Sequence, residues 1–248
     1  MKPSFFIVGF QKSGTTTLYD ALMSHPDVSP GLMKENNILA EPKDRLDEFK
    51  LCFPQNQKGK MTGDASHLHT WMPYGLERIK KYYPKAKIIV IMRNPSERAF
   101  SHFNMDQKIG YVPKNTSFRQ LIDIELNLRR SLSDEAKMED VYHNLKLYGN
   151  KYGWPLSRGL YHLYLEEMQK LELDFLPLFM EEMNESWEEA IAKVFEYVGV
   201  KPFELPAKVS NKGVYKSSLD DDLKAQLDDF YQIPNQKLAA LLQRSLPW

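Results

Sequence analysis

The sequence predicts an α/β fold in which a parallel sheet is flanked by helices. Two short apolar runs, residues 4–9 and 86–92, have the composition of buried strands. Each run ends in a segment that contains glycine or proline, and helical spacing of apolar residues follows at 15–24 and 97–104. A strand–loop–helix unit that occurs twice is typical of proteins with parallel sheets.

The rest of the chain adds further helices and one more strand to this pattern. Apolar spacing predicts a crossover helix, a later helix, a possible strand and another helix, in that order, at 72–83, 159–171, 173–179 and 187–198. Helical spacing returns after residue 220, and Pro234 is expected to interrupt it. Apolar residues are spread along the whole length, so we assign residues 1–248 to one domain with a helical insertion at 106–158.

Composition argues against several classes of protein. The chain has 33 basic and 33 acidic residues, and its net charge of zero does not favour nucleic acid as a partner. Cys52 is the single cysteine and cannot form an internal disulfide, which fits a reducing compartment such as the cytoplasm. No apolar run has the length that a membrane span needs. We therefore expect a cytoplasmic protein without a membrane or nucleic-acid partner, and the oligomeric state is left open.

The first strand leads into a loop at residues 9–17 that is suited to bind an anion. Backbone N–H groups and the helix dipole converge where a strand is followed by a helix. Gly14 permits close approach of the backbone, and Lys12 adds a mobile positive charge. The other polar side chains of this loop are Gln11, Ser13, Thr15, Thr16 and Thr17. The lysine precedes the second glycine, so the loop is not a Walker A motif, and an ordinary turn with a helix cap is the alternative.

A second candidate anion site follows the other strand. Arg93 stands at the carboxyl end of that strand, and Ser101 follows about two helical turns later. An arginine and a hydroxyl can bracket a phosphate, although an arginine before an Asn-Pro turn is more often part of a salt bridge at a helix start. Two such sites on successive strand ends indicate a ligand with two separate anionic groups.

Together these motifs resemble the signature of sulfotransferases that use 3'-phosphoadenosine 5'-phosphosulfate (PAPS). Lys12–Thr17 match the loop for the 5'-phosphosulfate, and Arg93–Ser101 match the motif for the 3'-phosphate. Further matches extend over nearly the whole chain, at His25–Val28, Lys34–Glu35, Gly63–Ser66, Arg158–Tyr161 and Pro234–Trp248. The chain is more similar to the heparan sulfate and bacterial small-molecule branch than to the cytosolic steroid and phenol enzymes. The resemblance implies a domain related to P-loop nucleotide kinases, with PAPS as donor, adenosine 3',5'-bisphosphate (PAP) as product and no metal.

The resemblance also implies roles for single residues. Lys12 would stabilise the charge that develops on the leaving phosphate oxygen, and Glu35 would take the proton of the acceptor. The segment after Glu35 departs from the family, because Asn36–Leu39 replaces His-Phe-Phe. A solvated loop carboxylate is therefore the alternative for Glu35. Reserve candidates for the base are Asp64, His67 and His102.

Two further groups of residues have weaker assignments. A late segment with Lys212, Gly213 and Tyr215 resembles the one that closes over the nucleotide, although a basic turn is an equal alternative. His67 and His69 are two residues apart in a predicted loop or strand, and we expect them to line the site and not to bind a metal ion.

The charge of the predicted insertion bears on the acceptor. Residues 106–158 contain nine lysines and arginines against seven aspartates and glutamates, which does not favour a polyanionic acceptor. We expect a hydroxyl, or an amine, of a small-molecule natural product or metabolite, with Asp106 near a cationic group of that acceptor. A carbohydrate O-sulfotransferase is the second hypothesis. A P-loop-like kinase and a nucleotide-binding module without catalysis are alternatives of other classes.

Overall fold

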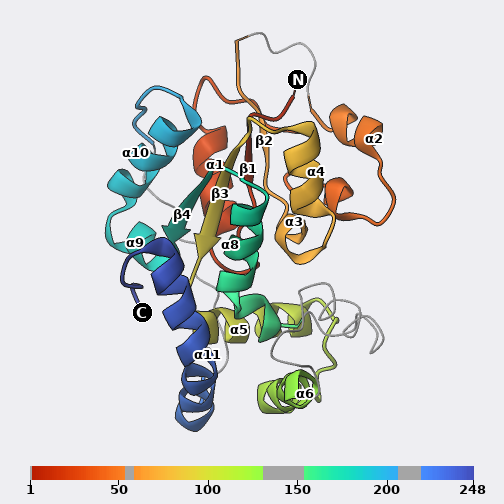
Figure 1. Ribbon diagram of the computed structural model, residues 1–248, viewed down its shortest axis with the longest axis vertical. Helices are drawn as coiled ribbons and strands as arrows, with labels where there is room; N and C mark the ends of the chain where they lie inside the picture. Colours follow the sequence, from red (N-terminus) through yellow and green to blue (C-terminus); the bar gives the residue numbers. More distant parts are fainter. Residues whose placement is uncertain (1, 54–58, 131–153, 206–218) are drawn as a thin grey trace. The chain divides into compact units, whose positions relative to one another are not determined.

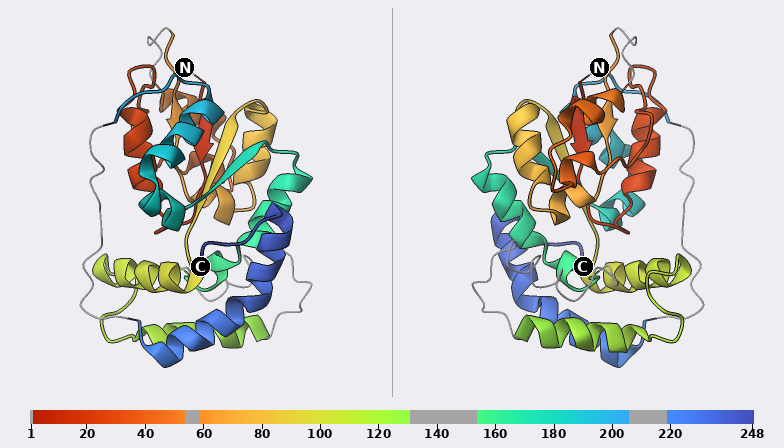
Figure 2. Two further views of the ribbon diagram at one scale, coloured as in Figure 1. Left: turned by 90° about the vertical axis from the view of Figure 1, so that its left-hand side faces the viewer. Right: turned by 90° about the vertical axis from the view of Figure 1, so that its right-hand side faces the viewer.

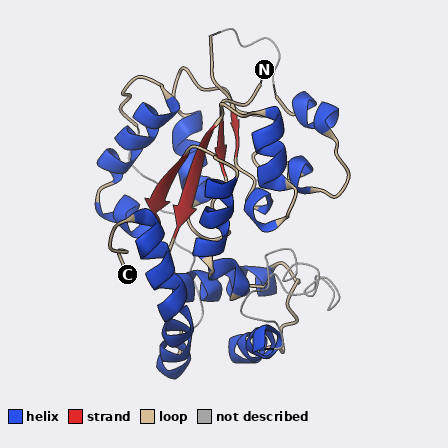
Figure 3. Ribbon diagram, viewed as in Figure 1, coloured by secondary structure: helices blue, strands red, loops and turns tan. Residues whose placement is uncertain are grey.

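The described strands form one parallel sheet of four (Figure 3). The structure, a computed structural model, describes residues 2–53, 59–130, 154–205 and 219–248. These residues group into two compact units. We call them the sheet unit, within residues 1–93, 166–212 and 247–248, and the helical unit, within residues 94–165 and 213–246.

The sheet unit alternates strands with helices, as the sequence predicts. Its strands are β1 (Phe5–Ile7), β2 (Gly63–Asp64), β3 (Lys87–Met92) and β4 (Phe175–Phe179). Its helices are α1 (Thr15–Met23), the 3-10 turn η1 (Ile38–Ala40), α2 (Leu46–Leu51), α3 (Leu68–Trp71), α4 (Gly75–Tyr82), α9 (Met180–Glu185) and α10 (Trp187–Val198). The helical unit contains α5 (Pro95–Lys108), α6 (Phe118–Arg130), the 3-10 turn η2 (Ser157–Gly159) and α11 (Asp221–Leu242). Helix α8 (Tyr161–Lys170) begins in the helical unit and ends in the sheet unit.

Strand β1 lies inside the sheet, and the strand order is β2-β1-β3-β4. All three pairs are parallel, with Phe5 opposite both Gly63 and Lys87, and Ile89 opposite Leu176. The α/β class with a parallel sheet flanked by helices is therefore confirmed. The order of the strands follows from long-range pairing, which periodicity along the chain does not reveal.

Alternate residues of the strands bury two different faces of the sheet. Ile7 of β1 and Ile89 of β3 pack with residues of α1 and α10 in one core cluster. Phe6 points to the opposite face, where its ring meets those of Phe49 and Tyr83 at centroid distances of 6.2 and 5.6 Å. Figure 1 shows the same division, with α1 and α10 on one side of the sheet and α3 and α4 on the other. The sheet is therefore covered on both faces, as parallel sheets generally are.

The carboxyl end of β1 lies unusually close to β3. The ladder continues beyond the strand, since the N–H groups of Val8 and Phe10 donate to the carbonyl oxygens of Ile89 and Ile91 at 2.9 and 3.3 Å. A Cβ atom on Gly9 would lie 2.2 Å from Cγ2 of Ile91 and 2.8 Å from its carbonyl oxygen. Only glycine fits this contact, which fixes the point at which the following loop leaves the sheet.

Helices α5, α6 and α11 enclose the core of the helical unit (Figure 2). Phe103, Leu121 and Leu227 are among its buried residues. Glu125 of α6 is also fully buried, and its carboxylate accepts hydrogen bonds from the N–H groups of Leu156 and Ser157 at 3.0 and 2.9 Å. Burial raises the pKa of Glu125 to about 7, against the effect of these donors. The carboxylate therefore fastens α6 to the segment that leads into η2.

Several predicted elements are confirmed, and two need correction. The strands near 4–9 and 86–92 and the helix at 187–198 are present, although the predicted helix at 72–83 begins only at Gly75, beyond Pro73. The prediction that Pro234 interrupts the last helix is wrong, because α11 continues through it. Its buried residues recur at helical spacing on both sides of the proline, and their burial offsets the lost hydrogen bond. Within the described residues, neither α11 nor any other helix is long and apolar enough to cross a membrane.

We expect Gly9→Ala to lower the free energy of unfolding by about 1–3 kcal/mol, because the new methyl group would overlap Ile91. Gly31→Ala is the matched control. The nearest atom to a Cβ there is the carbonyl oxygen of Cys52 at 3.2 Å, so the loss should be smaller. Urea denaturation of the three proteins measures both changes. Equal losses in the two variants would show that the contact between β1 and β3 is not as tight as described.

Candidate active site

The loop between β1 and α1 has the geometry of an anion-binding turn. We call residues 9–14 the phosphate loop. Lys12 and Gly14 have left-handed backbones, with φ of 73° and 99°. Gly14 is the N-cap of α1 and has no side chain with which to cap it, so the N–H groups of the first turn are left for another acceptor. A Cβ atom on Gly14 would lie 3.3 Å from Cδ1 of Ile91, so the loop rests directly on β3.

Ser13 gives the phosphate loop a buried hydroxyl group. The residue is fully buried, and its N–H donates to the carbonyl oxygen of Phe10 at 3.0 Å. Its Oγ atom has no hydrogen-bond partner among the described residues. A buried hydroxyl without a partner costs free energy, and a ligand oxygen would satisfy it. The neighbouring Thr15 is also buried, whereas Thr16 is exposed and Gln11 and Thr17 are half-buried.

The chain leaves β1 and β2 toward opposite faces of the sheet. The phosphate loop leads to α1 on one face, and the segment after β2 leads to α3 and α4 on the other. Ligands of open α/β sheets bind at such a switch point, beyond the carboxyl ends of the strands. Candidate residues from both segments should therefore meet at this edge.

Glu35 does lie at this edge, between two basic side chains. Lys34 Nζ donates to Glu35 Oε1 at 2.7 Å and to Thr16 Oγ1 at 2.8 Å. Nδ1 of His67, which follows β2, is 3.2 Å from Glu35 Oε2. Partial burial acts to raise the pKa of Glu35, but the hydrogen bonds from His67 and Lys34 outweigh it and lower the pKa to about 2. Lys34 thus links Glu35 to the first turn after the phosphate loop.

Asp64 and His69 form a buried pair behind Glu35. His69 Nδ1 is 3.4 Å from Asp64 Oδ2, and both side chains are fully buried. Burial raises the pKa of Asp64 to about 7 and lowers that of His69 to about 3, because it disfavours the charged form of each group. The expectation of a loop or strand is wrong for His69, which lies within α3, whereas His67 stands in the turn that precedes this helix, as its N-cap. Within the described residues, no group of three or more potential ligands has the arrangement of a metal site.

The residues predicted for the second anion site belong to different units. Arg93 follows β3, which is paired with β1, so the half-buried Arg93 and the phosphate loop leave the same edge of the sheet. Ser101, His102 and Asp106 lie in α5 of the helical unit and are buried. His102 Nε2 is 3.2 Å from Asp106 Oδ2, and burial lowers the pKa of His102 to about 3.

The predicted Lys212, Gly213 and Tyr215 lie outside the described residues. Sequence reasoning missed the contacts that Lys34, Asn36 and Ser66 make in the site. The adjacent Lys34 and Glu35 are a signal in the sequence that could have indicated an ion pair. The contacts of Asn36 and Ser66 reach residues 28 and 29 positions away, and no local pattern indicates them.

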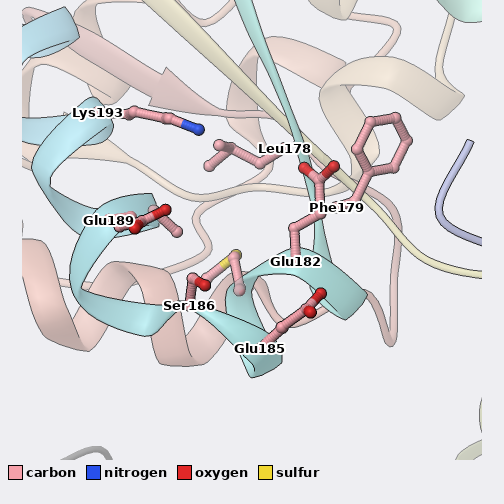
Figure 4. A pocket seen from close by; sticks show the side chains of 9 residues that line it. Leu178, Phe179, Glu182, Glu185, Ser186, Glu189 and Lys193 are labelled. Carbon is pink, nitrogen blue, oxygen red and sulfur yellow. The ribbon is translucent and has the colours of Figure 1, made fainter. Parts of the chain in front are cut away.

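A pocket of about 200 Å³ lies beside α9, α10 and the end of β4, and none of the residues predicted from the sequence lines it. Figure 4 shows the carboxylates of Glu182, Glu185 and Glu189 and the ammonium group of Lys193 around it. The excess of negative charge does not suit a ligand with phosphate groups. The phosphate loop remains the better candidate for an anion.

Comparisons with known proteins agree with this geometry. Bifunctional heparan sulfate N-deacetylase/N-sulfotransferase 1 of Caenorhabditis briggsae is 22% identical over an alignment 273 positions long, which covers 98% of this chain and 30% of that protein. The chain thus spans about a third of the length of this relative.

Two solved structures share the fold. A sulfotransferase from Alicyclobacillus acidocaldarius has a TM-score of 0.77 and 22% identity, with 99% of this chain and 98% of that one covered. Mouse sulfotransferase SULT7A1 complexed with PAP has a TM-score of 0.52 and 19% identity, with 92% and 63% covered. A family model described as a sulfotransferase domain matches residues 2–227, and the protein belongs to this sulfotransferase family.

Proposed function

We propose that this sulfotransferase moves a sulfuryl group from PAPS to a hydroxyl, or an amine, of a small-molecule natural product or metabolite in the cytoplasm. The observation that carries the proposal is the phosphate loop. Its buried Ser13 hydroxyl, which has no partner in the part of the chain that the structure describes, and the uncapped start of α1 offer donors to one anion. The mouse structure of the same fold was obtained with PAP, which supports a related donor here.

The 5'-phosphosulfate of the donor would lie against the phosphate loop and the first turn of α1. In this proposal its contacts come from Gln11, Lys12, Ser13, Gly14, Thr15, Thr16 and Thr17. Arg93 and Ser101 would bind the 3'-phosphate, and Lys212, Gly213 and Tyr215 would close over the nucleotide. Lysine and arginine suit these tasks differently, since Lys12 can follow a moving charge while the planar guanidinium of Arg93 can hold a static phosphate with two hydrogen bonds.

The transfer requires one bond to form and one to break at sulfur. The acceptor oxygen forms the new bond to sulfur, and the bond between sulfur and the bridging oxygen of the 5'-phosphate breaks in line with it. The electron pair of the broken bond stays on that phosphate oxygen, where Lys12 stabilises the charge. The acceptor proton passes to Glu35, with His67 hydrogen-bonded to the same carboxylate.

Lys34 would couple donor binding to the strength of this base. A carboxylate that accepts hydrogen bonds from Lys34 and His67 is a weak base, as its low pKa indicates. Because Lys34 also donates to Thr16, a donor sulfate or phosphate in this place would compete with Glu35 for the ammonium group. Withdrawal of Lys34 would raise the pKa of Glu35 when the donor is bound.

A carbohydrate acceptor is the second candidate, because a relative that aligns with nearly the whole chain is named for heparan sulfate. The nearly balanced charge of residues 106–158 favours the small molecule instead. Turnover of labelled PAPS with small hydroxylated compounds and amines, and with heparan-type oligosaccharides, separates the two. Transfer to the oligosaccharides alone would replace the first candidate by the second.

We expect the protein to bind PAP and Lys12→Ala to weaken binding about 10–100-fold, because one charge-assisted contact with a phosphate is lost. Isothermal titration calorimetry measures both affinities. Lys43→Ala removes an exposed lysine outside the site and should leave the affinity unchanged. If the folded wild-type protein binds no PAP, the proposed donor is wrong.

Glu35→Gln should reduce turnover about 10²–10⁴-fold, the usual contribution of a general base, without weakening PAP binding. The assay is the transfer of labelled sulfonate to the best acceptor found above. Glu77→Gln, on the exposed side of α4, is the control and should retain full activity. Wild-type turnover in Glu35→Gln would assign proton transfer to another group, with His67 as the next candidate.

The ionised state of Glu35 should also appear in the stability of the protein. Its pKa falls from an ordinary value of 4.5 to about 2 on folding, so its stabilising contribution is complete above pH 4.5 and is lost as the pH falls toward 2. The difference in unfolding free energy between wild type and Glu35→Gln should therefore shrink between pH 5 and pH 2.5. Urea denaturation at both values measures it, and a constant difference would contradict the ion pair with Lys34.

A further inference from the structure

The loop that carries Lys34 and Glu35 is fastened to the segment after β2. The N–H of Ala65 donates to the carbonyl oxygen of Lys34 at 3.2 Å, and the N–H of Asn37 donates to Ser66 Oγ at 3.1 Å. Asn37 has a left-handed backbone with φ of 54°, so the loop turns sharply just after Glu35. Regular structure begins only afterwards, at η1. Contacts to the neighbouring segment therefore have to hold the position of Glu35.

Asp64 is the centre of these contacts. Asn36 Nδ2 donates to Asp64 Oδ1 at 2.5 Å, and the N–H of Ser66 donates to Asp64 Oδ2 at 3.0 Å. The other end of the Asn36 amide, Oδ1, accepts a hydrogen bond from the N–H of Ile38 at 3.1 Å. Each polar atom of the Asn36 side chain thus has one partner, and the chain is held on both sides of Glu35.

The surroundings of Asp64 suit support of the loop better than contact with an acceptor. Asp64 is 1% exposed, and His69 lies 3.4 Å from its Oδ2 atom. His69 is itself fully buried, with the edge of its ring against Phe6 at a centroid distance of 6.0 Å. Burying a carboxyl group costs free energy unless its hydrogen bonds are satisfied. Asp64 is therefore placed where it can organise the loop but not touch the reacting atoms.

We propose that Asp64 is a positioning residue that acts through Asn36 to hold Glu35 against the donor site. The inference rests on the proposed function, because it concerns the same base. Asp64 is then not an alternative base, as the sequence suggests, but a residue that fixes the position of the loop. The hydrogen bond between Asn36 and Asp64 also anchors the loop directly after Glu35, where the sequence departs from the related enzymes.

An exchange of the two side chains tests this directly. In Asn36→Asp two carboxyl groups face each other, and turnover should fall about 100-fold. In Asp64→Asn an amide N–H₂ group faces a donor, and the loss should be about 10-fold. In the double variant N36D/D64N, every donor again meets an acceptor and the net charge is unchanged. Turnover should return to within about 3-fold of wild type, as expected for directly coupled sites.

Two further measurements separate positioning from general damage. PAP affinity by calorimetry should remain near the wild-type value in all three variants, so the loss should fall on kcat and not on donor binding. Asn184→Asp, an exposed change of the same kind in α9, should have no effect. Melting temperatures and circular dichroism confirm that each variant is folded.

The possible outcomes are distinct. A double variant as slow as Asn36→Asp, or single variants as fast as wild type, would overturn the positioning role while leaving PAP binding intact. Absence of PAP binding in the wild-type protein would instead remove the proposed function. Recovery of kcat in the double variant, with PAP affinity and melting temperature near wild type in every variant, supports the role, because the loss then follows the contact between Asn36 and Asp64 and not the stability of the fold.

Discussion

The contact between the end of β1 and β3 sets the position of the whole candidate site. The ladder between these strands continues to the N–H of Phe10, and Gly9 brings the backbone onto Ile91. The phosphate loop therefore begins at a fixed point on the sheet. Gly14 lies against the same isoleucine, so one apolar side chain supports both ends of the loop. Close packing is what allows such a turn to present its donors in one arrangement before a ligand arrives.

Two carboxyl groups on neighbouring segments have pKa values that are shifted in opposite directions, for identifiable reasons. Glu35 is 34% exposed and has two basic partners, and these partners lower its pKa to about 2. Asp64 is buried, and burial raises its pKa to about 7 although two donors contact it. Environments that separate the pKa values of two carboxyl groups allow them to take different tasks. Glu35 is accessible and can take a proton once Lys34 turns to the donor, whereas the buried Asp64 suits support of the loop.

Local features of the site could be predicted from the sequence, and long-range ones could not. The phosphate loop is contiguous, and strands such as β3 or helices such as α10 are long enough to show their periodicity. Strand β2 has two residues, which is too short for any pattern, so the position of Asp64 at its end was not foreseen. The contact between His67 and Glu35 joins residues 32 positions apart. Neither spacing nor composition carries that information.

The departure of the sequence after Glu35 has a physical explanation in the loop. The resemblance implies a histidine and two aromatic residues at this place, where this chain has Asn36–Leu39. Asn36 has a donor and an acceptor on one short side chain, so it can bridge Asp64 and the backbone of Ile38 at the same time. Polar anchoring of this kind needs a buried acceptor on the neighbouring segment, and Asp64 supplies it. A loop can therefore keep one reactive residue while its flank changes, provided that the new flank finds hydrogen-bond partners on the neighbouring segment, as Asn36 does in Asp64.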